Sequence, residues 1–206
     1  MKVYGHPAST CTRKVLTTLA EKGHDAQFQL VDLMKGEQKN PQFTALQPFG
    51  VVPVLDDAGF ILYESRAIIR YLDQTLSGTS LTPADPKDRA MMEQWLSVEQ
   101  SYFSPGTMKI VMNLLFAPMM GKQADMAAVE QGKSDTGRTL DVLARHLEKN
   151  EYLAPSGFSL ADISYMPYIE YLFAAKSGDL ITSRAPVAGW WERISSRPSW
   201  KKVVGR

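Results

Sequence analysis

The segment PFGVVPVLDDAGFILYESRAIIRYL, residues 48–72, carries the most informative succession of signals in the chain. A Phe-Gly turn is followed by a short apolar run interrupted by Pro53, an Asp-Asp-Ala-Gly turn, and a second apolar run that ends at Tyr63. Glu64 and Ser65 then open a stretch with the period of an amphipathic helix. The segment therefore predicts a strand, a hairpin turn, a second strand and a helix.

Two features of this segment predict a ligand site. Proline lacks a backbone donor, so Pro53 should lie at the start or edge of its strand and leave the main chain of Val52 free to pair with an extended peptide. The helix that begins near Ser65 presents unpaired amides and the positive end of its dipole, which suit a carboxylate. A Val-Pro dipeptide and a serine helix cap are each common alone, so the hypothesis depends on their combination.

Composition limits the class of protein. The chain has 206 residues, of which 44% are hydrophobic, enough for one large domain or two modest ones. Its 23 basic and 22 acidic side chains nearly balance, so net charge does not favour nucleic acid or an anionic membrane surface as a partner. We expect small molecules or proteins as partners.

Targeting, redox and metal signals are sparse. The chain opens with MKVYG, and no segment reaches the roughly 18 uncharged apolar residues of a spanning helix. Cys11 is the single cysteine, which excludes an internal disulfide and fits a reducing compartment. The three histidines lack ligand spacing, so no metal site is predicted. Together these features predict a cytoplasmic protein with no membrane partner.

The order of the remaining elements predicts two domains. A strand at 2–5, a helix at about 10–22 and a second strand near 27–32 precede the hairpin and helix, which is the order of a thioredoxin-like domain. Beyond the turn-rich stretch SGTSLTPADP, the long segments have helical period. We therefore predict an α/β plus all-α protein with a thioredoxin-like domain at 1–76, a linker at 77–86 and an α-helical bundle domain at 87–206.

Local signals in the second half predict structure rather than chemistry. Asp85 and Pro86 suit the N-cap and first position of a helix. Ser159 and Asp162 have the spacing of a capping box. The tryptophans near the C-terminus are expected to be packing anchors; they are Trp190, Trp191 and Trp200.

The ordered combination of motifs resembles the glutathione-binding half of the cytosolic glutathione transferases. The matching stretches read Q-P-F-G-V-V-P-V-L and E-S-R-A-I-I-R-Y-L. The stretches K-V-Y-G-H-P-A-S-T and G-E-Q-K are most similar to the plant phi class, a serine-type class, with the theta class as the alternative. The resemblance covers the whole chain, although its specific motifs lie within residues 1–72. It implies a cis bond between Val52 and Pro53.

The resemblance implies an enzyme, a glutathione S-transferase that adds glutathione thiolate to apolar electrophiles in detoxification. Glutathione is then the co-substrate, no metal is needed and a homodimer is expected. Ser9, four residues before Arg13, would donate a hydrogen bond to the sulfur. Lowering a thiol pKa by about 2 takes about 2.7 kcal/mol. A hydroxyl bond to a charged acceptor supplies about 1.5 to 3 kcal/mol, and a helix terminus about 0.3 to 1 kcal/mol more.

The resemblance also implies six further glutathione contacts. These are Gln38 and Lys39 at the glycine carboxylate, Val52 and Pro53 at the cysteinyl residue, and Glu64 and Ser65 at the γ-glutamyl group. The chain departs from the phi pattern at Val51, where glutamine is usual, so one side-chain contact is missing.

Alternatives remain at the sulfur and for the function. Thr10 could share the donor role of Ser9, and Tyr4 stands where other classes carry a catalytic tyrosine. Cys11 could form a mixed disulfide with glutathione, which would make the protein a glutathione-dependent peroxidase or thiol exchanger. A non-catalytic glutathione- or ligand-binding protein is the third hypothesis. The aromatic and methionine-rich run at residues 102–120 suits either a core or an apolar substrate pocket.

Overall fold

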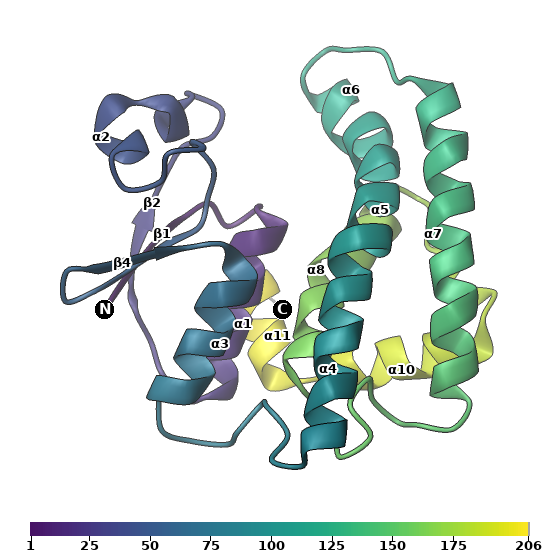
Figure 1. The fold of residues 1–206 in the computed structure, drawn as a ribbon. Helices are drawn as coiled ribbons and strands as arrows, with labels where there is room; N and C mark the ends of the chain where they lie inside the picture. The colour runs from purple at the N-terminus through teal and green to yellow at the C-terminus, as the bar shows by residue number, and fades with distance from the viewer. Residues whose placement is uncertain (206) are drawn as a thin grey trace. The chain divides into compact units, whose positions relative to one another are not determined.

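The computed structural model describes residues 1–205, and its internal contacts divide the chain into two compact units. The first unit holds residues 1–81 together with the C-terminal helix α11 (Pro198–Val204), and the second holds residues 82–197. The two units are described separately below. Figure 1 shows a mixed unit at the N-terminal end of the colour scale and an all-helical unit through the teal and green range.

The first unit has the element order that the sequence predicts for a thioredoxin-like domain. Its elements are β1 (Lys2–Gly5), α1 (Thr10–Glu21), β2 (Gln27–Leu30), η1 (Glu37–Lys39), α2 (Pro41–Thr44), β3 (Val54–Asp57), β4 (Phe60–Tyr63) and α3 (Ser65–Thr75). The sheet order is β2-β1-β3-β4, with β1 parallel to β2 and antiparallel to β3, and β3 antiparallel to β4. The predicted parallel pair and hairpin are both confirmed.

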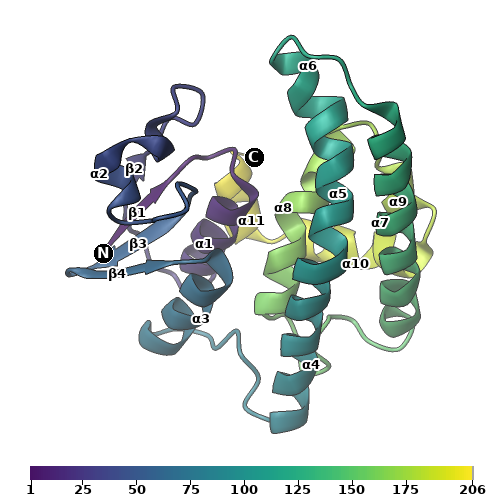
Figure 2. The same ribbon diagram turned by 45° about the horizontal axis from the view of Figure 1, so that its top comes forward.

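The pleat of the sheet separates two apolar layers in the first unit. Val3 and Leu55 are neighbours in the β1–β3 register and are fully buried. Residues of alternate position, Tyr4 and Val54, belong instead to a cluster with Phe43 of α2. Helices α1 and α3 pack against each other, as Figure 2 shows. Strand β3, which begins two residues after the proposed ligand-pairing residue Val52, is therefore held between two packed layers.

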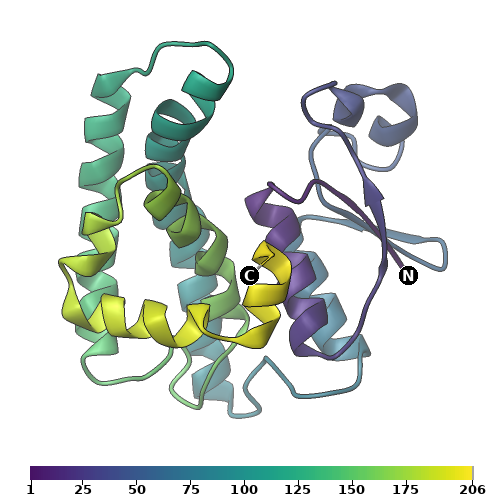
Figure 3. The same cartoon turned by 180° about the vertical axis from the view of Figure 1, so that it is seen from behind.

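Helix α11 packs on α1 and groups with the first unit, although the sequence assigns it to the helical domain. The Ser199 hydroxyl donates to the Glu21 carboxylate, and Lys202 Nζ lies 2.9 Å from Asp25 Oδ1. Trp200 is fully buried, which confirms its predicted role as a packing anchor. Figure 3 shows α11, in yellow, beside α1. The predicted limits of 1–76, 77–86 and 87–206 stay a prediction.

A buried ion pair fixes the end of the first unit. Lys22 Nζ contacts Asp73 Oδ1 at 3.0 Å and also donates to the carbonyl of Thr79 at 3.1 Å. The same Asp73 oxygen accepts the Leu81 amide at 2.9 Å. Gly78 has a φ of +102°, and an added Cβ would lie 2.7 Å from the Lys22 carbonyl oxygen. The first part of the predicted linker is therefore fastened to α1 and α3.

The second unit is entirely helical in its regular structure within residues 82–197. Its elements are α4 (Pro86–Val98), η2 (Glu99–Phe103), α5 (Ser104–Val111), η3 (Met112–Phe116), α6 (Ala117–Met119), α7 (Met126–Leu147), α8 (Leu160–Ala174), α9 (Asp179–Thr182) and α10 (Ala185–Ser195). Asp85 caps α4 by accepting the Lys87 and Asp88 amides, which confirms the predicted start. No helix within residues 1–205 is long and apolar enough to span a membrane.

Helix α8 forms the core of the second unit. The predicted capping box of Ser159 and Asp162 is present at its start. Asp162 also accepts hydrogen bonds from the Leu153 amide at 3.1 Å and from the Trp190 indole at 2.9 Å. Trp190 is fully buried, whereas Trp191 is half-buried and stacks on Phe173. Burial of Asp162 raises its pKa against the opposing effect of these donors.

Candidate functional site

Ser9 is the N-cap residue of α1, with extended backbone angles of φ −76° and ψ 126°. Its Oγ accepts the Thr12 amide at 3.2 Å, and its own amide donates to the His6 carbonyl at 2.9 Å. Within residues 1–205 the Ser9 hydroxyl donates no hydrogen bond to the protein. The half-buried hydroxyl can therefore donate to an anion placed at the positive end of α1.

The residues that follow Ser9 differ in what they can offer. Thr10 and Cys11 are half-buried in the first turn of α1, and Cys11 is a free thiol. Arg13 folds back so that its Nε donates to the Pro7 carbonyl at 2.8 Å. Arg13 therefore holds the turn before α1, which favours a supporting role over direct contact with a ligand.

The peptide bond between Val52 and Pro53 is cis, as the resemblance implies. Strand β3 begins at Val54, which pairs with Tyr4 on one side and Tyr63 on the other. Pro53 thus precedes the strand, as predicted, and the main chain of Val52 lies outside the ladder. Only 8% of Val52 is exposed, so its side chain anchors the position in the core.

The GEQK loop lies directly against the turn that leads to Val52. Lys39 Nζ donates to the Phe49 carbonyl at 3.1 Å. Gly50 has a φ of +60°, and an added Cβ would lie 2.8 Å from the carbonyl oxygen of Gln38. Glycine is therefore required where these two loops meet. The fold brings Gln38 and Lys39 against the segment before Val52, with Lys39 bonded to Phe49 across a separation of 10 residues.

Gln38 contributes an unusual polar atom to this junction. Its Oε1 is buried and has no hydrogen-bond partner within residues 1–205. A buried polar atom in that state costs about 1 to 3 kcal/mol. Unsatisfied groups of this kind are characteristic of places that a ligand or an ordered water completes.

Gln47 is a supporting residue that the sequence analysis missed. Its side chain is 1% exposed, and its Oε1 accepts the Val51 amide at 3.3 Å. Its carbonyl also accepts the Gly50 amide at 2.9 Å. Gln47 therefore shapes the turn on both sides of Gly50. The available signal was a long amide side chain immediately before the Pro-Phe-Gly turn.

Glu64 has a strained backbone in front of α3. Its φ of 71° and ψ of 107° lie outside the regions that non-glycine residues prefer, at a cost of about 1 to 3 kcal/mol. Its side chain is exposed, and its carbonyl accepts the Ile68 amide at 2.9 Å. Ser65, the first residue of α3, is buried. The strain holds an acidic side chain outward beside a helix N-terminus, which the sequence did not predict.

The candidate residues form separate groups rather than one bonded network. Within residues 1–205, no hydrogen bond joins Ser9 to Gln38, Lys39, Glu64 or Ser65. Val51, which stands where the phi pattern has glutamine, is exposed, and its side chain cannot donate a hydrogen bond. A ligand that used all these groups would have to provide the bonds between them. An extended peptide with two carboxylates and a thiol has that chemistry.

Two family models match most of the chain. The glutathione S-transferase N-terminal domain matches residues 1–74, and the glutathione S-transferase C-terminal domain matches residues 107–198. The chain is 40% identical over 203 residues to glutathione S-transferase F10 of Arabidopsis thaliana, covering 97% of this chain and 94% of the relative. It is 41% identical to glutathione S-transferase F11 of the same plant, covering 99% and 97%.

Solved structures agree with the relatives. Glutathione transferase F2 of Populus trichocarpa superimposes with a TM-score of 0.94 at 39% identity, covering 99% of this chain and 97% of that one. Glutathione S-transferase I from maize, in complex with an atrazine–glutathione conjugate, superimposes with a TM-score of 0.91 at 30% identity, covering 99% and 96%. The chain belongs to the glutathione S-transferase family, whose enzymes use glutathione as co-substrate, and it stands with the phi-class transferases of plants.

Proposed function

We propose that this protein is a serine-type transferase that adds glutathione thiolate to apolar electrophiles, with the Ser9 hydroxyl donating to the sulfur. The observation that carries the proposal is the bonding of Ser9. Its oxygen accepts the Thr12 amide, which orients the hydroxyl, while its hydrogen is not used by the protein within residues 1–205. Position at the start of a 12-residue helix adds favourable electrostatics for a thiolate.

The remaining contacts follow from the two loops and the strained turn. Val52 would pair its main chain with the cysteinyl residue, because Pro53 places it before the ladder. Gln38 and Lys39 would take the glycine carboxylate, with the Gln38 side-chain NH2 and the Lys39 ammonium as the donors. Glu64 and Ser65 would bind the γ-glutamyl group at the N-terminus of α3.

The electrophile class is inferred from a relative and from exposed side chains. The maize relative forms a complex with an atrazine–glutathione conjugate, so a halogenated heteroaromatic ring is a reasonable first substrate to test. In the second unit Met112, Met119 and Met120 are exposed, whereas Phe103 is fully buried. The aromatic and methionine-rich run is therefore partly core and partly surface, and only the exposed part can contact a substrate.

The decisive experiment compares three single variants in conjugation assays. We expect Ser9→Ala to lower kcat/KM by about 10- to 150-fold, the loss of one hydrogen bond to a charged acceptor of about 1.5 to 3 kcal/mol. Thr10→Ala and Cys11→Ser are the matched controls in the same turn and should lose less than about threefold. Undiminished turnover by Ser9→Ala would remove Ser9 from the mechanism.

The same assays separate the other hypotheses. Loss of activity in Cys11→Ser, together with a glutathione adduct on Cys11 by mass spectrometry, would favour thiol exchange or peroxidase chemistry. Tight glutathione binding without turnover on an electrophile panel would favour a binding protein. A homodimer and a cytoplasmic location are part of the proposal by analogy with the family, and sedimentation and fractionation test them.

A further inference from the structure

The edge strand β2 is exposed along its whole length. It lies at one end of the sheet order, and among residues 1–205 it pairs only with β1. All four of its residues are exposed, including two large apolar ones, Phe28 at 39% and Leu30 at 52%. Figure 3 shows β2, the purple-blue arrow, at the edge of the sheet. Natural edge strands usually carry lysine, proline or a bulge that prevents further pairing, whereas β2 reads QFQL in a regular register.

Half of the main-chain groups of β2 are unused. In a parallel ladder, alternate residues direct their amide and carbonyl to the neighbouring strand. The Gln27 amide donates to the Met1 carbonyl at 3.2 Å, so the odd-numbered residues of β2 face β1. Phe28 and Leu30 therefore direct their amides and carbonyls outward, and no group of the described chain is hydrogen-bonded to them. An additional strand could pair with these four groups.

A cavity of about 360 Å³ opens beside this edge, on the face of the sheet that α2 covers. Gln29 and Leu30 of β2 line it together with Tyr4, the register neighbour of Gln29. The other walls come from η1, α2 and the residues adjoining them. The volume is close to the lower limit of about 300 Å³ for ligand sites, so it suits one long side chain. None of the proposed glutathione contacts lines it.

Glu37 is the only charged residue of the described chain that lines the cavity. Its Oε2 accepts the Asp32 amide at 2.7 Å, which orients the carboxylate, and no residue between 1 and 205 donates to its Oε1. The lysines nearest in the chain have other partners. Lys35 Nζ lies 3.1 Å from Asp32 Oδ2, and Lys39 Nζ donates to the Phe49 carbonyl. A half-buried carboxylate with one unused oxygen favours a cationic donor.

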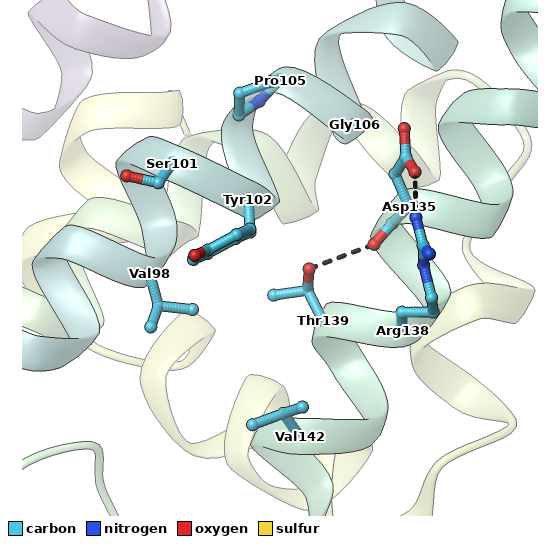
Figure 4. A pocket seen from close by; sticks show the side chains of 9 residues that line it. All are labelled: Val98, Ser101, Tyr102, Pro105, Gly106, Asp135, Arg138, Thr139 and Val142. Atoms are coloured by element: carbon cyan, nitrogen blue, oxygen red, sulfur yellow. Dashed lines mark hydrogen bonds and ion pairs between the residues drawn. The ribbon is translucent and has the colours of Figure 1, made fainter.

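A carboxylate of the helical unit shows the opposite situation. Figure 4 shows Asp135 in the wall of another cavity, where a dashed line joins it to Arg138. Its Oδ2 lies 2.9 Å from Lys109 Nζ, and its Oδ1 accepts from Gln131 at 2.9 Å. The protein itself therefore uses both oxygens of Asp135, whereas one oxygen of Glu37 is left for a partner.

We propose that β2 binds an extended peptide segment of a partner protein, which adds an antiparallel fifth strand to the four-stranded sheet and has the alternation apolar-basic-apolar. Residues opposite each other in a ladder share a face, so the two apolar side chains would cover Phe28 and Leu30. The residue between them lies opposite Gln29. Its basic side chain would therefore enter the cavity and donate to Glu37.

The occupant is a peptide segment rather than a second copy of the chain. Pairing of two four-residue strands gives a contact far below the roughly 1,200 to 2,000 Å² that a stable interface buries. The sequence QFQL also has no basic residue to offer to Glu37. The proposal does not rest on transferase activity, because its main-chain groups and its cavity lie outside the proposed glutathione contacts.

The test is a fluorescence-anisotropy titration of the full-length protein with a labelled, end-blocked peptide, Thr-Val-Lys-Val-Thr. We expect saturable binding that weakens at least about tenfold when glutamate replaces the lysine of the peptide. Glu37→Gln keeps an acceptor for the Asp32 amide and loses the charge, so it should bind both peptides equally. Glu148→Gln makes the same charge change at an exposed residue that ends α7, and this matched control should behave like wild type.

Methylation of peptide nitrogens tests the main-chain pairing. Methylating both valine amides removes the donors to the Phe28 and Leu30 carbonyls and should weaken binding at least about tenfold. The lysine amide points away from β2, so methylating it is the matched control and should change the affinity less than about threefold. In hydrogen exchange, saturating peptide should slow the Phe28 and Leu30 amides. The Val31 amide already donates to the Gly5 carbonyl at 2.9 Å and should be unchanged.

Four results would overturn the proposal. Two are equal binding of the lysine and glutamate peptides by wild type, and unchanged hydrogen exchange at Phe28 and Leu30. Saturating S-methylglutathione should leave the affinity for the peptide unchanged, and displacement would place the peptide in the glutathione site instead. Sedimentation should give the same protein assembly with and without peptide. Dissociation of an assembly by the peptide would show that a second copy of the chain occupies this edge.

Discussion

Ser9 and Ser159 occupy the same position of two helices, the N-cap of α1 and the N-cap of α8, yet their hydroxyls are used in opposite ways. Ser9 is half-buried, and within residues 1–205 its hydroxyl only accepts a hydrogen bond, from the Thr12 amide. Ser159 is 1% exposed and donates its hydroxyl to Asp162 Oδ2 at 2.9 Å. Within the described residues 1–205 the hydrogen of the first hydroxyl is not used, whereas the second hydroxyl donates to a core carboxylate.

The residue three positions after each serine accounts for the difference. At α8 it is Asp162, whose carboxylate accepts both the hydroxyl and the amide of Ser159. At α1 it is Thr12, whose hydroxyl oxygen is directed to the His6 amide at 3.4 Å. In a capping box an acidic residue at this position accepts the serine amide, and at α8 the Asp162 carboxylate accepts the Ser159 hydroxyl as well. A helix start without one leaves the serine able to act on a bound anion.

The largest expected effect comes from breaking the α8 side of the comparison with Asp162→Ala. Four buried donors lose their acceptor, namely Ser159 by its amide and hydroxyl, the Leu153 amide and the Trp190 indole. Unpaired buried donors cost about 1 to 3 kcal/mol each before the structure relaxes, so we expect a loss of about 3 to 5 kcal/mol in the free energy of unfolding. Urea unfolding measures it, and exposed Asp179→Ala should change stability by less than about 0.5 kcal/mol.

The next largest effect is expected for Ser9→Ala, which tests the α1 side of the comparison. It is measured as the pKa of bound glutathione rather than as the stability of the protein. Without the hydroxyl donor we expect the pKa of bound glutathione to rise by about 1 to 2, since each pKa unit corresponds to about 1.4 kcal/mol. Thiolate absorbance against pH measures this directly. Ser9→Thr should restore much of the effect because it keeps the hydroxyl. A bound thiol whose pKa is the same in wild type and Ser9→Ala would show that another group ionises it.

Ser159→Ala should have a smaller effect, and it should lower stability rather than activity. Removing an N-cap side chain costs about 0.5 to 2 kcal/mol, and Asp162 keeps its bonds to Leu153 and Trp190. We therefore expect a lower melting temperature with unchanged kcat/KM per folded molecule. Thermal unfolding and conjugation assays on the same samples separate the two readouts. A large loss of kcat/KM at temperatures where the variant is folded would contradict the assignment of Ser159 to structure.

Signals that act within a few residues carried the sequence predictions furthest. The hairpin, the start of β3 after Pro53, and the helix starts at Asp85 and Ser159 all depend on neighbours in the chain, and the structure confirms each. The resemblance supplied the cis bond before Pro53. Contacts that depend on tertiary packing were not predictable from such patterns. The packing of α11 on α1 needs Ser199 to meet Glu21, the last residue of α1, and Lys202 to meet Asp25 beyond it, 178 and 177 residues earlier.

The candidate site, like the fold, was predicted from the sequence only where short local motifs carry the signal. The types of residue at Ser9, Lys39 and Glu64 were readable from motifs, because each motif is short and ordered. The backbone strain of Glu64 and the burial of Gln47 were not, because both depend on how α3 and the GEQK loop pack against the sheet. Roles at glutathione remain predictions, since they concern a ligand whose contacts only a complex would show.

The smallest effect expected is a pH dependence that distinguishes Asp162 from a surface carboxylate. Burial raises the pKa of Asp162, so the folded chain holds this proton more tightly than the unfolded chain, whose aspartates titrate near about 3.9. The stability that the carboxyl contributes is then fully present below that pH and is lost as pH rises through the folded pKa. The advantage of wild type over Asp162→Asn in urea unfolding should therefore be largest in acid and should shrink as pH rises above about 3.9, because the asparagine does not titrate.

Asp25 is the matched control of opposite sign in the first unit. The hydrogen bond from Lys202, and then its charge, lower the pKa of this exposed carboxyl. Its contribution is therefore present above the unfolded pKa of about 3.9 and is lost as pH falls through the folded pKa. The advantage of wild type over Asp25→Asn should be constant from about pH 5 to about pH 8 and should shrink only in acid. If Asp162→Asn and Asp25→Asn gave the same pH profile, burial would not be the cause of the pH dependence at Asp162. The buried and the surface carboxyl would then not differ in the direction of their pKa shifts.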